Sequence, residues 1–519
     1  MQPRPFPSRI TAPSPAEDEP PEGAYKWSVM LVAGSGIYMV TLDSGIVNVA
    51  LPVLTAEFHT ALNTAQWVIL GYLLCITALL LPAGRLADML GRKRVFLVGF
   101  LLFAGSSALC GLAPSIGWLV AARVLQGIGG ALVQANSPAL VTQAFPSSER
   151  GRALGIVSAI VSVGLLSGPM VGGLITQYLG WRWAFYVNVP ISIVATAVGT
   201  RLLRPSPRQS DQRFDLAGAV LFLMAVVALL LTLTTGPSRG WQSAETVALA
   251  ALALVGAAAF LQVERRVPQP MLDLSLFANQ GFRAAAAAAF LNFLALAQVI
   301  LLMPFYLQRV LELPVSQAGV IMAAIPATNM FVAPFSGTLS DRLGSRMIAS
   351  LGMLVECVGF LSLLTLRRNE PAALVAARLV LLGFGLGLFN SPNSSALFGS
   401  VPRSRLGVVG GMQALTRNLG QSLGQAIAGA LWTAVLGALA GSSVATAVAA
   451  GNAAALGQAV PAAMTAFRVN FGLSLVLGLA ALCISLLGRP SEESRRPDRG
   501  PAQRKVAVAT QATEEVEEV

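Results

Sequence analysis

The sequence predicts an all-α membrane protein made of two six-helix bundles related by pseudo-twofold symmetry, with two further helices inserted between them. Three observations support this fold class. The chain is 55% hydrophobic and only 11% charged, whereas soluble domains carry about 25% charged residues. Its apolar residues gather into long runs that can each cross a bilayer. Several short motifs recur about 250 positions later in the same order.

Fourteen segments meet the requirement of about 20 mostly apolar residues for a spanning helix. They lie at 27–52, 64–83, 95–113, 116–140, 151–176, 183–203, 214–235, 243–262, 281–307, 316–338, 346–366, 371–395, 404–435 and 467–488. The Ala- and Gly-rich stretch 436–466 is expected to form a long outer loop that is partly helical.

The placement of Lys and Arg predicts the orientation in the membrane. With the N-terminus inside, seventeen basic residues fall in inner loops and six in outer loops. This asymmetry predicts a multi-pass protein of the plasma (inner) membrane with both termini cytoplasmic. The net charge of +11 does not indicate nucleic-acid binding, because the basic residues separate apolar runs and form no patch with aromatic residues.

Four patterns repeat with nearly constant spacing. Asp341 follows Asp88 by 253 positions within matching loops, and the five residues at 119–123 return unchanged at 374–378. A six-helix unit needs about 200 residues, so the spacing leaves room for two extra helices. The predicted organisation is a cytoplasmic tail at 1–26, a bundle at 27–203, inserted helices at 214–262, a bundle at 281–488 and a second tail at 489–519.

The repeated loop is a basic hairpin punctuated by glycine. Glycine allows a sharp turn, and each Asp can accept hydrogen bonds from the free amide groups at a helix start. We expect both loops to latch one conformational state. The residues concerned are Gly84, Asp88, Gly91, Arg92, Asp341, Gly344 and Arg346.

Asp43 is a carboxylate deep in the first span, where an unpaired charge costs several kcal/mol. Counting from the span ends at about 1.5 Å per residue, Asp43 and Arg123 lie at matching depth. We expect Asp43 to be protonated reversibly, with Arg123 stabilising its charged form. The alternative is a fixed structural ion pair.

Glu356 is the other carboxylate placed well inside a span, and the repeat gives it no counterpart. Three roles are open: a second proton site, a contact for a cationic substrate, or an ion-pair partner of Arg417 or Arg378. Because the repeat mate of the first span has no acid, protonation chemistry is expected mainly in the first half.

The fifth span carries a glycine stripe with a proline. Small residues at a spacing of four let another helix approach closely, and proline bends the helix. The stripe predicts a tight, kinked surface for movement, although simple helix packing gives the same pattern. Its residues are Gly164, Gly168, Pro169, Gly172 and Gly173.

Polar residues within other spans are candidates for a substrate cavity, although single membrane-buried amides usually join helices. The candidates are Gln126, Asn292, Gln298, Asn329, Asn390, Gln413 and Arg417. The sequence has no phosphate-binding loop. The one histidine, His59, lies outside any metal-ligand cluster. We therefore expect neither an enzyme nor a bound metal or cofactor.

Four motifs resemble signatures of the major facilitator superfamily. They are the loop at 84–94, the Arg123 to Gly127 run, the Gly164 to Gly173 run and the Leu42 to Pro52 run. The glycine-proline run is similar to the motif that marks the antiporters of this family. Fourteen helices and the run at 181–190 resemble the drug:proton antiporter branch with EmrB/QacA-type exporters. Gly45, where the family usually has Thr, and the run 134–136 depart from its pattern.

The resemblance covers about residues 27–488 and implies the major facilitator fold, alternating access and export driven by inward proton flow, with Asp43 as coupling carboxylate. We therefore predict a monomeric, bilayer-embedded antiporter for protons and hydrophobic small molecules, of amphipathic or cationic character, that confers drug resistance. A dedicated exporter of one endogenous metabolite, siderophore or lipid is the alternative. A membrane enzyme would form product without a gradient, and a sensor would bind ligand without transporting it.

Overall fold

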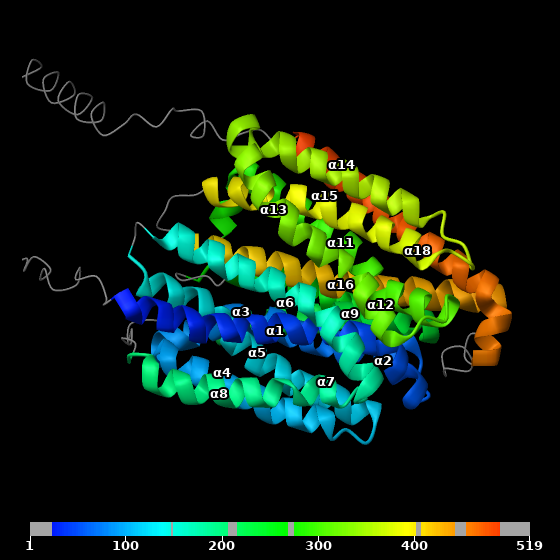
Figure 1. The fold of residues 1–519 in the computed structure, drawn as a ribbon, viewed down its shortest axis with the longest axis horizontal. Helices are drawn as coiled ribbons and strands as arrows, with labels where there is room; N and C mark the ends of the chain where they lie inside the picture. Colours follow the sequence, from blue (N-terminus) through cyan, green and yellow to red (C-terminus); the bar gives the residue numbers. More distant parts are fainter. Residues whose placement is uncertain are drawn as a thin grey trace, which may run out of the picture.

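The computed structural model describes residues 23–146, 149–205, 215–267, 274–400, 406–441 and 453–487. The regular elements of these residues are helices, most of them long and running side by side (Figure 1). The predicted tails lie almost entirely outside the described residues.

The first half of the chain forms one bundle, drawn in blue to green in the lower part of Figure 1. Its helices are α1 (Gly23–Glu57), α2 (Leu62–Ala65), α3 (Trp67–Leu90), α4 (Arg92–Gly111), α5 (Ile116–Ala144), α6 (Arg150–Tyr178), α7 (Trp183–Tyr186) and α8 (Asn188–Leu202). The predicted sixth span is thus divided between α7 and α8.

The second half forms the other bundle, in the upper part of the same view. Its elements are η2 (Leu274–Ala278), α11 (Gln280–Phe305), the π-helix η3 (Tyr306–Val310), α12 (Val315–Met322), α13 (Ala324–Leu343), α14 (Ser345–Leu363), α15 (Ala372–Gly399), α16 (Leu406–Ala440) and α18 (Ala453–Leu487). The second bundle repeats the packing of the first: α11 packs on α16 as α1 packs on α6, and α13 packs on α15 as α3 packs on α5.

The inserted helices are α9 (Leu216–Arg239) and α10 (Ala244–Glu264), which pack against each other. α9 also packs against α3 of the first bundle and α16 of the second. Leu70 and Leu74 of α3, Leu230 of α9 and Ala426 of α16 share one apolar cluster. The insertion therefore covers a seam between the two bundles.

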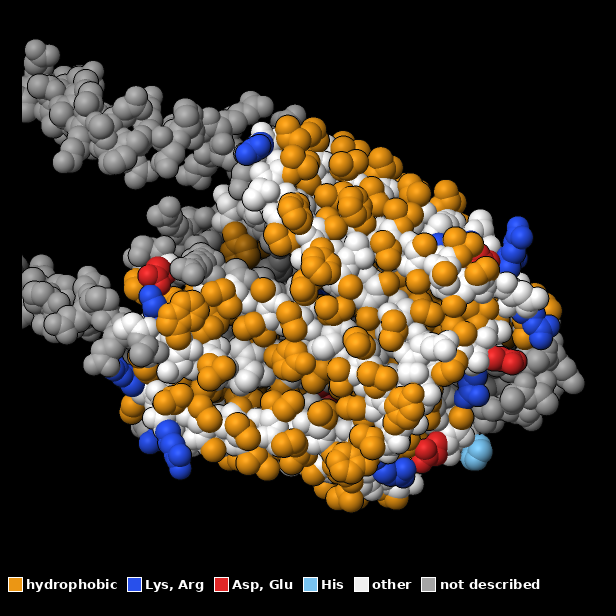
Figure 2. Space-filling model, viewed as in Figure 1, with side chains coloured by type: hydrophobic (Ala, Val, Ile, Leu, Met, Phe, Trp, Pro, Cys, Tyr) orange, Lys and Arg blue, Asp and Glu red, His pale blue; other side chains and the backbone are white. Residues whose placement is uncertain are grey.

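Thirteen helices of the described residues are long and apolar enough to cross a membrane. The remaining predicted span is α3, whose apolar part is the shorter segment Trp67–Leu80. Figure 2 shows hydrophobic side chains over the middle of one face, while Lys and Arg lie toward both ends. This distribution is the one that a bilayer requires.

The prediction of a long loop at 436–466 was wrong at both ends. α16 continues to Ala440, and α18 already begins at Ala453. Leu436 and Phe467 are buried in the main apolar cluster, and alanine is the best helix former. Burial and propensity therefore extend both helices, and residues 442–452 lie outside the described part.

Both copies of the repeated loop turn at a glycine in the left-handed region. Gly91 has φ 95° between α3 and α4, and Gly344 has φ 91° between α13 and α14. Only glycine adopts such angles without strain. The side chains of Asp88 and Asp341 lie outside the described part of the chain.

A basic residue near the start of the third helix of each bundle contacts the end of the sixth. Lys93 Nζ donates to the carbonyl of Thr200 at 2.9 Å, near the end of α8. Arg346 Nε donates to the carbonyl of Ser485 at 3.2 Å, near the end of α18. Because the last carbonyls of a helix carry partial negative charge, these contacts stabilise the same corner of both bundles.

Candidate functional site

Asp43 and Arg123 form a buried ion pair inside the first bundle. Arg123 Nη1 lies 2.5 Å from Asp43 Oδ2, and neither side chain has exposed surface. α1 supplies the acid and α5 supplies the base, which the packing of these two helices brings together. The equal depth inferred from the sequence thus corresponds to direct contact.

Two amides complete the surroundings of the carboxylate. Asn188 Nδ2 of α8 donates to Asp43 Oδ1 at 2.8 Å, and Gln126 Nε2 of α5 donates to the same oxygen at 3.1 Å. Gln126 Nε2 also donates to Ser107 Oγ at 2.5 Å. The carboxylate of Asp43 therefore receives three hydrogen bonds, one of them from a cation.

The guanidinium of Arg123 has partners besides Asp43. Its Nε donates to the carbonyl of Val68 at 2.8 Å, and its Nη1 also donates to Gln126 Oε1 at 2.6 Å. Its Cζ lies 3.9 Å from the centre of the Tyr72 ring, a cation–π contact. Arg123 therefore has three partners that do not depend on the charge of Asp43.

Sequence reasoning identified Asp43 and Arg123 but missed most of the groups around them. Asn188 drew attention only as part of a family-like run, and Tyr72 and Ser107 drew none. All three are buried, and Asn188 is an amide near the start of an apolar helix. A buried amide in a span needs a partner, so this signal was present, but the partner depended on helix packing.

Glu356 lies in a second buried polar group, between α14 and α11. Its side chain is fully buried, and Asn292 Nδ2 donates to its Oε2. Its Oε1 has no hydrogen-bond partner among the described residues. The predicted ion pair with Arg378 is absent, because Arg378 bonds instead to Glu370, at 2.6 Å. Arg417 likewise forms no ion pair with Glu356 within the described chain.

The predicted cavity residues divide into two groups. Gln126 and Asn292 belong to the two buried polar groups just described. Gln298 is fully buried, and neither polar atom of its side chain has a partner in the described part of the molecule. Asn329 is also buried. These four residues are enclosed by protein, so none of them lines an open cavity here.

The remaining candidates are only half-buried. They are Asn390 of α15 and Gln413 and Arg417 of α16. Gln413 Nε2 donates to Ser394 Oγ at 2.6 Å, which joins α16 to α15. Residues that are polar and partly open inside a membrane bundle are better candidates for contact with a substrate than enclosed ones.

The glycine stripe of α6 lies directly against α1. A Cβ added at Gly168 would lie 2.7 Å from Gly45 Cα, and one added at Gly172 would lie 2.7 Å from Ile46 Cα. Conversely, a Cβ on Gly45 would lie 2.9 Å from Gly168 Cα. The departure from threonine at Gly45 is therefore explained, because any side chain there would separate the two helices.

The same helix contacts the other bundle through Gly173. A Cβ added there would lie 2.8 Å from the carbonyl oxygen of Val315 and 3.1 Å from Gly319 Cα, both in α12. α6 therefore has one glycine face toward its own bundle and another toward the second bundle. Close backbone contact without side chains permits small sliding movements.

The comparisons with known proteins agree with this architecture. The model of the Major Facilitator Superfamily matches residues 34–425. The chain belongs to this superfamily. RibZ, a riboflavin transporter of Clostridioides difficile, is 32% identical over 396 residues, 76% of this chain and 85% of that protein. Stp, a multidrug resistance protein of Mycobacterium tuberculosis, is 37% identical over 392 residues, 75% of this chain and 73% of that protein.

A third relative is the tetracenomycin C resistance and export protein of Streptomyces glaucescens. It is 32% identical over 397 residues, 76% of this chain and 73% of that protein. Such relatives place the chain in the drug:proton antiporter branch of the superfamily, as the motifs indicated. The predicted fold class and family are confirmed.

Solved structures share the fold. A bacterial homolog of the human lysosomal transporter Spinster superposes with TM-score 0.66 at 19% identity, covering 90% of this chain and 97% of that one. A POT family peptide transporter gives TM-score 0.62 at 18% identity, covering 89% and 97%. At this identity the likeness shows the fold alone.

In this facilitator the two bundles touch at the end of the molecule where α1 terminates, which we name the far end. Gln308 Nε2 of η3 donates to the carbonyl of Val49 at 3.0 Å, and Arg309 Nη2 donates to that of Pro52 at 2.8 Å. The π-helical segment directs these neighbouring side chains onto α1. Such segments often occur at functional sites, and sequence reasoning missed both residues.

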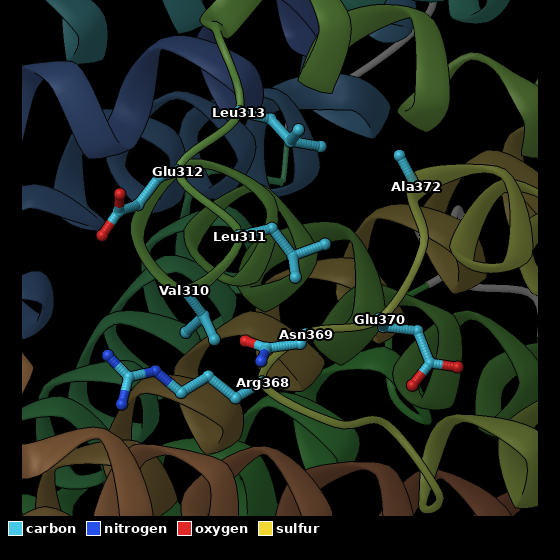
Figure 3. A pocket seen from close by; sticks show the side chains of 8 residues that line it. All are labelled: Val310, Leu311, Glu312, Leu313, Arg368, Asn369, Glu370 and Ala372. Atoms are coloured by element: carbon cyan, nitrogen blue, oxygen red, sulfur yellow. The ribbon is translucent and has the colours of Figure 1, made fainter.

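A pocket of about 430 Å³ opens near the same end (Figure 3). Its lining comes from two links of the second bundle, at 310–313 and 368–372. Glu370 in this lining is already paired with Arg378. Because the pocket lies within one bundle and away from the Asp43–Arg123 pair, we do not assign the substrate to it.

Proposed function

We propose that the protein is a proton-coupled antiporter that exports hydrophobic and amphipathic compounds across the plasma membrane by alternating access. The observation that carries this proposal is the fully buried Asp43–Arg123 pair. A titratable carboxylate in a span marks a proton or ion pathway more often than a structural contact. Its place in the first bundle, between three helices, lets a change of charge alter their packing.

Protonation of Asp43 would remove its attraction to Arg123 without leaving that arginine unbound. Arg123 keeps the Val68 carbonyl, Gln126 and the Tyr72 ring. Asn188 Oδ1 has no partner among the described residues, so rotation of this amide would offer an acceptor to the protonated acid. The surroundings of Asp43 therefore accommodate both of its protonation states.

Alternating access requires the contacts at the far end to open. The hydrogen bonds of Gln308 and Arg309 to α1 would break while the opposite end closes. We propose that the glycine faces of α6 guide this movement, and that the loops at Gly91 and Gly344 latch the opposite state. A proton or substrate shifts the balance only by binding one state better than the other.

Glu356 is the second candidate for protonation. Its carboxyl group is fully buried, with one amide donor and no cation among the described residues. We propose that it exchanges a proton only when the second bundle rearranges. Glu356→Gln should therefore retain part of the transport that Asp43→Asn loses. Equal loss of transport in both variants would mean that the two acids are equally important for coupling.

The relatives support two alternatives for the range of substrates, many unrelated compounds or a single one. Stp is named for multidrug resistance, which favours a broad exporter. RibZ and the tetracenomycin C protein are each named for one compound, which favours a dedicated exporter of one metabolite. Efflux of unrelated dyes by the purified protein separates these alternatives, because a dedicated exporter transports only compounds related to its own substrate.

Reconstitution tests the coupling directly. Purified protein is placed in liposomes with a pH-sensitive dye inside, and hydrophobic compounds are added one at a time. Antiport predicts that a transported compound changes the internal pH in the wild type and not in Asp43→Asn. Compound transport without movement of protons would overturn the proposal. The same preparation reports orientation, by protease access to the termini, and the expected monomeric state, by mass.

A further inference from the structure

Arg417 is a cation in the interior of a membrane helix, and none of the described residues supplies it with a counter-ion. It follows Leu406, the first residue of α16, by 11 residues, which is about 16 Å along the helix. Its guanidinium forms no hydrogen bond or ion pair with the described residues. The side chain is half-buried. Arg123 and Arg378, which also lie inside spans, both bond to acids, and Arg468 of α18 donates to the carbonyl of Leu366 at 3.5 Å.

The direction of Arg417 follows from the contacts of its neighbours on α16, which advances about 100° per residue. Gly420 faces α11, because an added Cβ would meet the carbonyl of Phe290 at 2.8 Å. Gly429 faces the first bundle, because an added Cβ would meet the side chain of Gln66. Arg417 lies about 60° from Gly420 and about 120° from Gly429, on the arc between them.

The opposite side of α16 is already filled. Leu419 and Leu423 pack with Leu74 of α3 and Leu230 of α9 in one apolar cluster. Arg417 therefore points away from the inserted helices and toward the interior between α11 and the first bundle. Its partial exposure at this depth is exposure to that interior.

The described interior offers no carboxylate to balance this charge. Asp43 is bound by Arg123, Glu356 is enclosed beside Asn292, and Glu370 is bound by Arg378. A guanidinium at the centre of a membrane helix costs about 3 kcal/mol on insertion scales. Because no partner among the described residues offsets this cost, we look for a partner outside the chain.

We propose that Arg417 binds an anionic oxygen group of the exported compound, such as a carboxylate, so that the substrate class includes hydrophobic organic anions. This inference rests on the export function proposed above and narrows it. A planar guanidinium binds a carboxylate through two parallel hydrogen bonds. Gln421 and Gln425 follow at successive turns of α16, and Gln425 Oε1 has no partner within the described chain, so hydrogen-bonding groups continue along the same side.

The expectation of cationic substrates, drawn from the sequence, predicts that cations are preferred over anions, the reverse of what Arg417 favours. A fixed positive charge repels a cation and attracts an anion, and the effect is large in a site of low dielectric constant. The described residues place a cation without an acidic partner toward this interior, whereas Glu356, an acid without a cationic partner, is enclosed beside Asn292. Charge complementarity therefore favours anionic or neutral compounds over cations.

A matched pair of dyes tests the proposal in liposomes with an imposed pH gradient. The probes are a diethylaminocoumarin carboxylate and its neutral ethyl ester, with ethidium as the cation. Arg417→Gln should raise KM for the carboxylate about 10- to 100-fold, the range expected for a lost charge-assisted hydrogen bond, and leave KM for the ester unchanged. Arg417→Lys should keep part of the preference. Arg283→Gln removes an exposed arginine near the start of α11 and should change neither value.

Binding in detergent, measured by dye fluorescence, separates this proposal from the export function. Weaker carboxylate binding by Arg417→Gln than by the wild type supports the anion site, whether or not a gradient drives transport. Absence of gradient-driven transport would refute the proposed antiport and leave the anion site standing. Equal carboxylate binding by wild type and Arg417→Gln would overturn the proposal, as would an Arg417→Gln variant that loses ester and carboxylate binding equally while folded. A thermal midpoint close to that of the wild type shows that the variant is folded, whether or not the ester binds.

Discussion

A buried acid in a membrane span needs a cation or hydrogen-bond donors in place of water, and Asp43 has both. A guanidinium and two amides donate to its two oxygens. Each donor comes from a helix other than α1, so the charged state of Asp43 joins α1, α5 and α8. At the scale of single residues, the proposed protonation of Asp43 would therefore change contacts among three helices.

Asp43→Asn removes the charge and keeps the size of the side chain. Breaking a buried pair by removing one partner typically destabilises by roughly 3 to 5 kcal/mol, although the other partners of Arg123 reduce this cost. We expect normal membrane insertion, a lower thermal midpoint and loss of substrate-driven proton movement. Measurement of both protein level and proton flux checks this, and full proton flux in the variant would remove Asp43 from the mechanism.

At the scale of helices, the contact between α1 and α6 depends on the absence of side chains. Gly168 lies so close to Gly45 that even a Cβ would overlap backbone atoms. This closeness cannot be adjusted by rotamers, because the atoms in contact are main-chain atoms. The two helices therefore move together or slide as rigid surfaces.

Gly168→Leu should reduce transport at least tenfold even where folded protein is recovered, because the side chain separates α6 from α1. Gly105→Leu is the matched control: an added Cβ at Gly105 meets no atom within 4 Å, and the residue is exposed on α4. Transport rates per folded molecule decide the question. Equal rates in the two leucine variants would mean that the stripe has no part in movement.

The turn glycines give a second prediction for the helical elements. Alanine at Gly91 or Gly344 must adopt a φ above 90°, which costs about 1 to 2 kcal/mol. Each variant should lower the thermal midpoint by a few degrees, and Gly84→Ala, inside α3 with no atom within 4 Å of an added Cβ, should not. Thermal unfolding of the purified variants measures this, and a similar midpoint for Gly84→Ala and Gly91→Ala would argue against strain at the turn.

At the scale of the whole molecule, the two bundles are joined at the far end by contacts that the proposed alternating access would have to break. Gln308 and Val49 lie on opposite bundles within hydrogen-bond distance. α9 covers a neighbouring seam between α3 and α16. Relative movement of the bundles would therefore change the contacts of the inserted helices.

A cross-link across the far end should stop transport reversibly. With Cys483→Ser as background, Gln308→Cys and Val49→Cys are joined by a short thiol-reactive linker that a reductant cleaves. Transport should fall to the level of empty liposomes when the linker is in place and return on reduction, because the far end cannot open. Single-cysteine variants are the controls, and undiminished transport by the cross-linked protein would contradict a closed far end.

The sequence by itself determined the membrane class, the two bundles with their insertion and the positions of nearly all spans, because apolar length and a repeat are properties of the chain alone. It also determined that Asp43 and Arg123 lie at equal depth, since helix rise converts residue count into distance. The error at 436–466 arose because an Ala- and Gly-rich segment carries little hydropathy signal, whereas burial of Leu436 and Phe467 depends on neighbours from other helices.

Only the tertiary structure decided which polar groups meet. Asn188 donates to Asp43, Arg378 pairs with Glu370 and not with Glu356, and Arg417 pairs with no acid in the described part of the chain. Each of these outcomes depends on how helices far apart in the chain are rotated about their axes. Rotating a helix by a few tens of degrees about its axis changes which polar side chains meet without changing the residues that span the membrane. The positions of the spans therefore do not determine that angle.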